Sequence, residues 1–581
     1  MATFNRVALA AVAGLALAAA LSAQETPESL LPPGFSQPAP PPADQPAPRQ
    51  SQVPITAPSG TRPSPTPAAS ASPTPGPTID AAMLARYELP DYARRSLARV
   101  GATGAEGLPP DAFGRADGRF LETLMRRIDA PVASRWLSIA LRRTLVSAVD
   151  TPANVNGADF AAERAWLLVR MGEAVAARAV VQGVDPDQAT PKLMQLAMQA
   201  ALATGDPAAM CPFADKGLSK TGERGWALAR AMCFGMAGEP AQAGAAVSAA
   251  RRRGLARGID LALAEKVVGA GAQGRRAVTI EWPGVDRLSA WRFGLAAATG
   301  VAIPDDLFAT AGPQVRYWHA LAPIYPAVAR AGDAELAAGQ GILSNLALVD
   351  LYGAIDDDED SASAGSGIAR DLRTAYVAGT AAERLTALKG LWGEPRAGNA
   401  RYGRLVLTAR AAARIRPSDA PEDADALIAS ILTAGLDRNA QRWAGQVANG
   451  SDGWAMLLLS DPAGRALAYG DADDFKGGGH KAQLFMAALA GLGRFSPEDM
   501  TRAADGYDLD LSRTDVWTRA IDTAARANQP GTVILLCAAG MQTGDWRGVR
   551  PDVLYRMLAA LRATGLDGYA RMMAAEAVAR L

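Results

Sequence analysis

Between Phe160 and Arg253, alanine-rich segments with a helical pattern of apolar residues alternate with short turns. Each turn begins with glycine, and the glycines recur at a fixed spacing of 33 residues. The three turns are Gly172-Glu173-Ala174, Gly205-Asp206-Pro207 and Gly238-Glu239-Pro240. A fixed period in this range, with one turn for each pair of helices, is typical of arrays of helical hairpins. The pattern therefore predicts an all-α fold built from hairpins.

The residue types in these turns have a physical explanation. Glycine can adopt the left-handed conformation that closes a helix at its C-terminal end. The acidic residue that follows favours the positive N-terminal end of the next helix. Pro207 and Pro240 suit the first turn of that helix, where the missing N–H group costs nothing. Small residues at Ala174, Ala208 and Ala241 would let paired helices pack closely, and we expect neighbouring hairpins to stack because one hairpin buries little apolar surface.

The repeat resembles the tetratricopeptide-like superfamily of α-solenoids over roughly residues 160–253. Besides the turns, alanines fill the small positions five residues after the turn glycine or seven residues before it: Ala177, Ala243, Ala165 and Ala231. Met198 and Met210 replace two other small residues, and the family's tryptophan and proline have no good match. The resemblance implies a concave surface that binds peptides or proteins, but it carries over no individual binding residue.

Composition supports a helical protein and argues against nucleic acid as a partner. Alanine is abundant and favours helices. Lys+Arg and Asp+Glu both total 59, so the net charge is zero and no broad basic field is present. At 581 residues the chain could contain several domains or one long solenoid.

The first 79 residues predict export. Residues 1–23 have the pattern of a signal peptide, because Arg6 precedes an apolar run from Val7 to Leu21 and Ser22-Ala23 offers small residues for cleavage. The alternative is an N-terminal membrane anchor, but the run is shorter than the about 20 apolar residues that cross a bilayer. Residues 24–79 are rich in Pro, Ala, Ser and Thr, and predict a disordered tether. The alanine-rich, arginine-over-lysine composition looks bacterial, so the predicted localisation is periplasmic, in soluble form.

Beyond the tether, we expect an N-terminal helical-repeat region at 80–355 and a C-terminal one at 368–581. An acidic and Gly/Ser-rich loop at 356–367 would separate them. A further hairpin turn is predicted at Gly332-Asp333-Ala334. The best candidate for a functional loop is Ala468–Lys481, AYGDADDFKGGGHK, because packing rarely needs a long glycine-rich connection. A flexible loop of no function is nevertheless the default interpretation.

The sequence contains no convincing catalytic or metal site. His319 and His480 are the two histidines, and no metalloprotease helix, nucleophile elbow or phosphate-binding Walker loop occurs. His319 lies among Tyr317, Trp318 and Tyr325, which favours aromatic packing. His480 could join Asp471, Asp473 and Asp474 around a metal ion, but such a combination is too common to indicate a site. We therefore predict no catalytic residue, no cofactor and no bound metal.

These observations predict an exported helical-repeat binding module or scaffold, with no enzymatic activity. Its partners would be other envelope proteins, or a peptide or glycan, and its oligomeric state is open. The alternative is an all-helical envelope enzyme that cuts glycans with paired carboxylates. Asp505, Asp508 and Asp510 would be the carboxylates to test, although nothing in their spacing singles them out and helix-capping or surface roles are the favoured interpretation.

The three cysteines predict one disulfide bond. An exported protein meets an oxidising compartment, and Cys537 lies in an apolar run that suggests a buried free thiol. Cys211 and Cys233 lie eleven residues before and after Gly222. Antiparallel helices folded about this glycine would place the two cysteines at the same height, so we predict a Cys211–Cys233 bond. The alternative is two small core residues at a helix interface.

Overall fold

The computed structural model describes residues 93–102, 107–271, 278–358, 364–394 and 398–581. The predicted signal peptide (1–23) and tether (24–79) lie outside these ranges. Residues Ser96–Leu581 belong to one compact unit. The second unit spans Ala39–Arg95, and all but its last three residues lie outside the described ranges.

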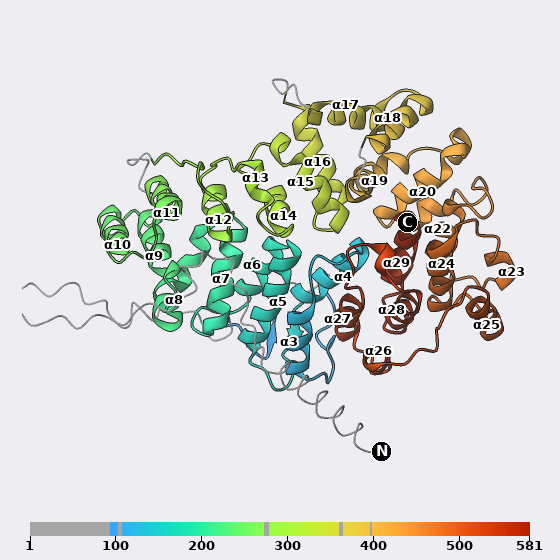
Figure 1. Ribbon diagram of the computed structural model, residues 1–581, viewed down its shortest axis with the longest axis horizontal. Helices are drawn as coiled ribbons and strands as arrows, with labels where there is room; N and C mark the ends of the chain where they lie inside the picture. The colour runs from blue at the N-terminus through green and yellow to red at the C-terminus, as the bar shows by residue number, and fades with distance from the viewer. Residues whose placement is uncertain (1–92, 103–106, 272–277, 359–363, 395–397) are drawn as a thin grey trace, which may run out of the picture. The chain divides into compact units, whose positions relative to one another are not determined.

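The described residues have the predicted all-α character (Figure 1). Their β-structure is limited to two short strands, β1 (Arg99–Val100) and β2 (Val149–Asp150), which pair antiparallel with Arg99 opposite Asp150. None of the described helices combines the length and the apolar content needed to cross a bilayer.

The helices follow one another along the chain in three groups. The first group contains α3 (Gly118–Arg127), α4 (Arg135–Val146), α5 (Gly157–Met171), α6 (Ala174–Gln182), α7 (Pro191–Ala203), the 3-10 helix η2 (Pro207–Phe213), α8 (Ala214–Thr221), α9 (Gly225–Met236), α10 (Pro240–Arg252) and α11 (Gly258–Gly271). The second contains α12 (Ala290–Ala298), α13 (Asp305–Phe308), α14 (Gln314–Leu321), α15 (Ala327–Gln340), α16 (Asn345–Asp356), α17 (Ala364–Val377) and α18 (Ala381–Gly393). The third contains α19 (Gly398–Ala412), η3 (Pro417–Asp419), η4 (Pro421–Asp423), α20 (Ala424–Thr433), α21 (Asp437–Gln441), α22 (Asp452–Ser460), α23 (Tyr469–Ala472), α24 (Gly479–Gly491), α25 (Pro497–Gly506), α26 (Val516–Arg526), α27 (Pro530–Gly540), η5 (Trp546–Gly548), α28 (Pro551–Ala563) and α29 (Asp567–Ala579).

The three predicted hairpin turns are present. Gly172, Gly205 and Gly238 have φ values of 89°, 61° and 78°, so each adopts the left-handed conformation for which glycine is suited. They join α5 to α6, α7 to η2, and α9 to α10. Pro207 and Pro240 are the first residues of the helices that follow. The second hairpin is the least regular, because a 3-10 helix and α8 replace one continuous helix.

The small residues expected between paired helices have different environments. Ala174 is buried. Ala208 and Ala241 are exposed, so they do not lie between closely packed helices. The alanines that carry the family resemblance are fully buried: Ala165, Ala177, Ala231 and Ala243. Met198 and Met210 are also fully buried, so the larger residues at those positions fill the core.

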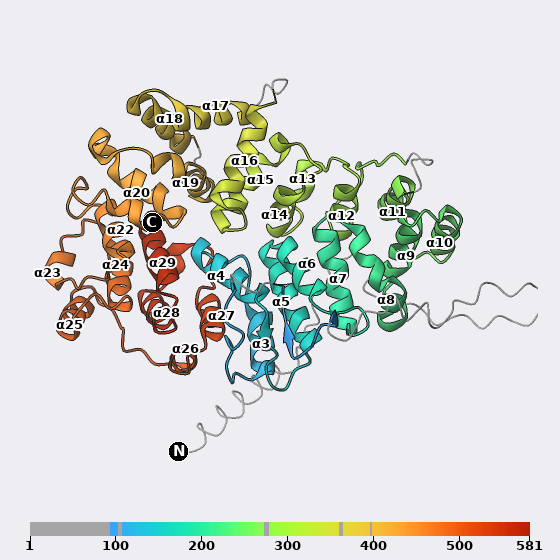
Figure 2. The same ribbon diagram turned by 180° about the vertical axis from the view of Figure 1, so that it is seen from behind.

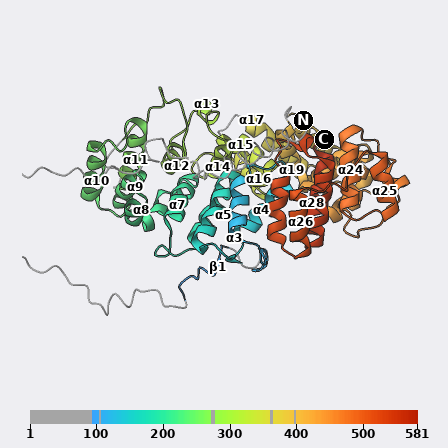
Figure 3. The same ribbon diagram turned by 60° about the horizontal axis from the view of Figure 1, so that its bottom comes forward.

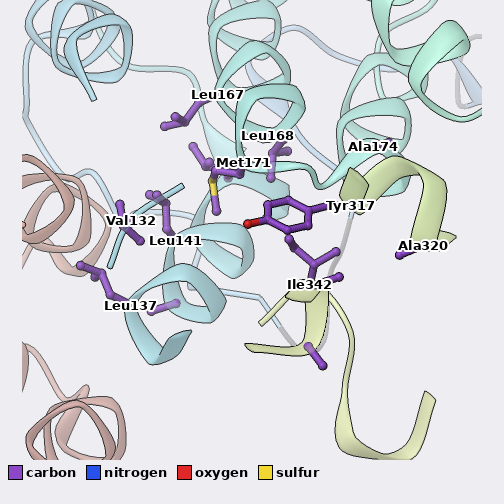
Figure 4. Close-up of a cluster of buried hydrophobic side chains, with 14 of the residues drawn as sticks. Val132, Leu137, Leu141, Leu167, Leu168, Met171, Ala174, Tyr317, Ala320 and Ile342 are labelled. Carbon is purple, nitrogen blue, oxygen red and sulfur yellow. The ribbon is translucent and has the colours of Figure 1, made fainter. Parts of the chain in front are cut away.

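Later helices cover two of the three hairpin turns. After α11 the chain returns, and α12, α14 and α15 pack on α7, α5 and α4 respectively (Figure 2). A β-carbon at Gly172 would lie 2.6 Å from the Tyr317 ring, and one at Gly205 would lie 3.0 Å from Ala297. Tyr317 is buried among apolar side chains of α4, α5 and the segment after α15 (Figure 4). The Gly172 turn is therefore buried in the core, whereas Gly205 and Asp206 remain partly exposed.

The prediction of a hairpin turn at Gly332-Asp333-Ala334 is wrong. These residues lie inside α15, which ends at Gly341 with φ of 89°. The buried Asp333 pairs with Arg316 and with His319 of α14, at 3.1 and 2.8 Å. Packing against α14 thus keeps the Gly-Asp pair within a helix.

The C-terminal helices pack on the N-terminal ones. Helix α27 contacts α3 and α4, and α29 contacts α4, so the red and blue helices lie side by side (Figure 1, Figure 3). The Glu576 carboxylate of α29 accepts hydrogen bonds from the Ser134 hydroxyl (2.6 Å) and from the backbone N–H groups of Arg135 (2.8 Å) and Trp136 (3.2 Å). This carboxylate satisfies N–H groups that the first turn of α4 cannot bond within the helix.

Arginines recurrently bond the carbonyl groups at helix C-terminal ends. Such carbonyls have no partner within their own helix and carry partial negative charge. Examples of the arginine and the acceptor carbonyl are Arg164 and Ser147 (2.8 Å), Arg142 and Gly341 (2.7 Å), Arg135 and Thr433 (3.4 Å), Arg494 and Asp461 (2.6 Å), and Arg571 and Ser460 (2.6 Å). The planar guanidinium, with its five donors, suits this role better than lysine does.

One hydrophobic cluster extends from Val100 to Val578. Asp356 is the last residue of α16, and α17 begins at Ala364, so the segment 356–367 expected as a loop includes the start of a helix. Because α16 packs on α17, helices on the two sides of this segment are in contact.

Candidate functional site

The predicted functional loop, Ala468–Lys481, is held by several interactions. It contains α23 and the first residues of α24. The Asp473 carboxylate accepts a hydrogen bond from the Tyr507 hydroxyl (2.8 Å), and the Lys476 N–H group donates to the Gly450 carbonyl (2.8 Å). The Lys481 ammonium pairs with Asp452 at 2.7 Å. These contacts join the loop to the start of α22 and to the end of α25.

A cavity of about 380 Å³, the loop cavity, lies where these segments meet. Lys476, Gly477, Gly478 and Lys481 line it from the predicted loop, and Asp452 lines it from α22. The loop that the sequence singled out therefore forms part of a concave surface. Its lining is mainly polar.

A second cavity of about 280 Å³, the α22 pocket, lies along the side of α22. Its apolar walls come from three parts of the chain: Val447, Trp454, Leu457, Leu458, Leu467 and Leu489. Trp454 and Leu458 are half-buried, one helical turn apart on α22. The pocket therefore exposes apolar surface in a concave site, as ligand-binding pockets commonly do.

Three charged groups line the α22 pocket. Asp461, which follows α22, accepts a hydrogen bond from Nε of Arg465 (2.8 Å), while the Arg465 side chain is 75% exposed. Although burial raises the pKa of Asp461, the bond from Arg465 and the Ala463 N–H group leave it below its ordinary value. Arg494 is only 3% exposed, and burial lowers the pKa of its guanidinium.

Within the described part of the chain, Arg494 has no carboxylate in direct contact. Its terminal nitrogen donates to the Asp461 carbonyl at 2.6 Å, and among the described residues no carboxylate oxygen lies within 4.0 Å of its guanidinium. The pocket thus places two arginine side chains and one carboxylate beside an apolar surface, with one net positive charge.

The residues considered for metal binding do not form a site. Across the described ranges, no three His, Cys, Asp or Glu side chains come together in a way that could hold a metal ion. Nε2 of His480 is buried without a hydrogen-bond partner, and Asp473 bonds Tyr507. His319 packs against Phe308 and Tyr325, with ring centroids 5.2 and 4.8 Å apart, in agreement with the aromatic packing expected for it.

The carboxylates named for the enzyme alternative lie on the surface. Asp505 at the end of α25, Asp508 and Asp510 are all exposed, and none of them lines the loop cavity or the α22 pocket. Asp510 accepts a hydrogen bond from the Ser512 hydroxyl at 3.0 Å. This arrangement gives no support to a paired-carboxylate site at these three residues.

The cysteines have the predicted arrangement. The sulfur atoms of Cys211 and Cys233 lie 2.06 Å apart, at disulfide distance, and the Cα atoms lie 5.6 Å apart. Gly222, with φ of 67°, ends α8 between them. Cys537 is a fully buried free thiol, and burial raises its pKa.

Comparison with known proteins adds no relative. No protein-family model matches the chain, and neither the curated proteins nor the solved structures contain a match.

The α22 pocket was not predicted from the sequence. Trp454, Leu457 and Leu458 occur in a strongly apolar helix, which is the usual pattern of a core element. The segment that follows this helix, 461–478, is irregular apart from the short helix α23, and Asp461, Arg465 and Leu467 of this segment line the pocket. An apolar helical pattern followed by a long irregular connection is the feature of the sequence that could have indicated this pocket.

Proposed function

We propose that this chain is an exported, non-catalytic binding module of the α-solenoid kind, which binds a protein partner in a bacterial envelope. The observation that carries the proposal is the α22 pocket, because a half-buried tryptophan and leucine line a concave, mainly apolar site. Aromatic and arginine side chains are also enriched at the centres of protein interfaces.

Two further observations support the proposal. The hairpins α5–α6 and α9–α10 each pack on the helix that follows them, α7 and α11, and packed hairpins of this kind can carry irregular segments that present a binding surface. The Cys211–Cys233 pair at disulfide distance fits an oxidising compartment outside the cytoplasm.

Site-specific cross-linking tests the proposed function. A photoreactive phenylalanine analogue is placed at Leu458 in the pocket, and a matched chain carries it at Val377 of α17, which is 69% exposed. We expect a discrete protein adduct in intact cells from position 458 only, and mass spectrometry would identify the adduct. The same adduct pattern from both positions, or none from position 458, would contradict the binding of a protein partner at this surface.

A further inference from the structure

The α22 pocket has the size of one large side chain. Its volume of about 280 Å³ exceeds the roughly 150 Å³ of a cavity that binds benzene, and is below the roughly 300–1,000 Å³ of sites for drug-sized ligands. A large apolar side chain with its adjoining main chain fits this range better than a cofactor does.

The walls favour an apolar side chain as the group that enters. Leu457, Leu458 and Leu489 surround the space together with the Trp454 ring. Burying a leucine or phenylalanine side chain against such walls is favourable because it removes apolar surface from water. A sugar would leave many hydroxyl groups without hydrogen-bond partners against these aliphatic walls.

The charges favour an acidic group beside that side chain. Arg465 bonds Asp461 through Nε alone, and the exposure of its side chain leaves the terminal nitrogens accessible to a ligand. Arg494 is buried and bonds only a carbonyl oxygen among the described residues. A ligand carboxylate would gain charge-assisted hydrogen bonds from the guanidinium groups, which suit the geometry of carboxylates.

We infer that the α22 pocket binds a peptide segment of the partner by one large apolar side chain and a neighbouring carboxylate. The carboxylate pairs with Arg465, and the buried charge of Arg494 strengthens the preference for an anion. The carboxylate belongs either to an adjacent acidic residue or to the C-terminus of the partner. This inference rests on the proposed function, since it names the chemistry of the ligand of the same pocket.

Three small probes test this chemistry on the full chain by ligand-observed NMR titration. They are N-acetylphenylalanine, N-acetylphenylalanine amide and N-acetylaspartylphenylalanine amide. We expect at least one of the two carboxylate probes to bind at least tenfold more tightly than the neutral amide. Tight binding of the first identifies a C-terminal carboxylate, and tight binding of the third identifies an acidic side chain.

Two variants locate the binding. Arg465→Gln changes an exposed side chain and should reduce the preference for the carboxylate probes to less than threefold. Leu458→Arg should abolish binding of all three probes, provided that its circular dichroism spectrum and melting match those of the wild type. The matched control is Arg99→Gln, because Arg99 is 54% exposed and bonds Asp150 through Nε at 2.7 Å, far from the pocket lining.

The outcomes separate this inference from the proposed function. Equal binding of all three probes, no binding of any probe, or a carboxylate preference that survives Arg465→Gln would overturn the inferred ligand chemistry. A protein adduct at position 458 would still support the binding role in each of these cases. A carboxylate preference without a protein adduct would instead support the pocket chemistry and contradict the proposed partner class.

Discussion

Glu173 provides a test of how strongly the fold buries a charge within a hairpin turn. Its side chain is 6% exposed, and its carboxylate accepts a hydrogen bond from Arg142 at 2.9 Å. The same guanidinium donates to the Gly341 carbonyl at 2.7 Å, so it joins the turn between α5 and α6 to the end of α15. Burial outweighs the attraction of Arg142 and raises the pKa of Glu173 to about 7.

The sign of the pH dependence follows from this pKa. In the unfolded chain the carboxyl titrates near its ordinary value of 4.5. The folded protein therefore holds the proton more tightly, and the stability contributed by Glu173 is full below pH 4.5 and is lost as the pH rises through about 7. The total loss is about 3 kcal/mol, of which about 2 kcal/mol falls between pH 5.5 and 8.5.

The perturbation is Glu173→Gln, which removes the charge and keeps an oxygen that can accept the bond from Arg142. We expect the free energy of unfolding of the variant, relative to that of the wild type, to rise by about 2 kcal/mol between pH 5.5 and 8.5. Urea unfolding, followed by circular dichroism at both pH values, measures this difference.

The chain supplies a matched control in Glu239→Gln. Glu239 follows the turn glycine of the third hairpin as Glu173 follows that of the first, but it is exposed. The control should change the free energy of unfolding equally at the two pH values. If Glu173→Gln also changes the free energy of unfolding equally at the two pH values, burial does not raise the pKa of this carboxyl group. If its relative stability falls as the pH rises, the ion pair with Arg142 outweighs burial and the reasoning is wrong.

Three other predictions concern the disulfide, a close helix contact and export. Replacing Cys211 and Cys233 by serine should lower the free energy of unfolding by about 3 kcal/mol, because the bond closes a loop between residues 22 positions apart. Alkylation of both thiols in unreduced protein would rule out the bond. Gly403→Ala should cost roughly 1–3 kcal/mol, because its β-carbon would lie 2.5 Å from a backbone oxygen of α15. The control Gly390→Ala, whose β-carbon meets no atom within 4 Å, should instead gain roughly 0.5–1 kcal/mol in the same urea assay. N-terminal sequencing of the exported protein should find the mature chain starting close to residue 23, and an intact start at residue 1 would contradict export by cleavage.

Local rules predicted the hairpin turns and the cysteine pair. Glycine adopts positive φ values readily because it has no β-carbon. The turns at Gly172, Gly205 and Gly238 could therefore be predicted without knowledge of their neighbours in space. The Cys211–Cys233 pair needed only the additional assumption that the chain reverses near Gly222. Both inferences depend on contacts between residues that are close in sequence.

Other parts depended on distant partners. The sequence Gly332-Asp333 has the same local form as the true turns, yet Arg316 and His319 of a neighbouring helix accommodate Asp333 within α15. For the candidate site, the glycine-rich composition singled out Ala468–Lys481 as a loop, and Lys476, Gly477, Gly478 and Lys481 of this loop line the loop cavity. The α22 pocket could not be found in this way, since its walls come from segments whose apolar residues are typical of a core.

The turn motif shows how one local sequence acquires different chemistry in different surroundings. Tyr317 covers Gly172, whereas no atom lies within 4 Å of a β-carbon placed on Gly238. The returning helix α14, which the repeat itself does not predict, therefore makes the first Gly-Glu pair part of the core and leaves Glu239 in solvent. Because burial is the largest cause of the raised pKa of Glu173, the difference in burial between Glu173 and Glu239 is a property of the second layer of helices. The paired variants at these two positions consequently test whether α14 and α15 pack on the hairpins in solution, which no measurement on an isolated hairpin could do.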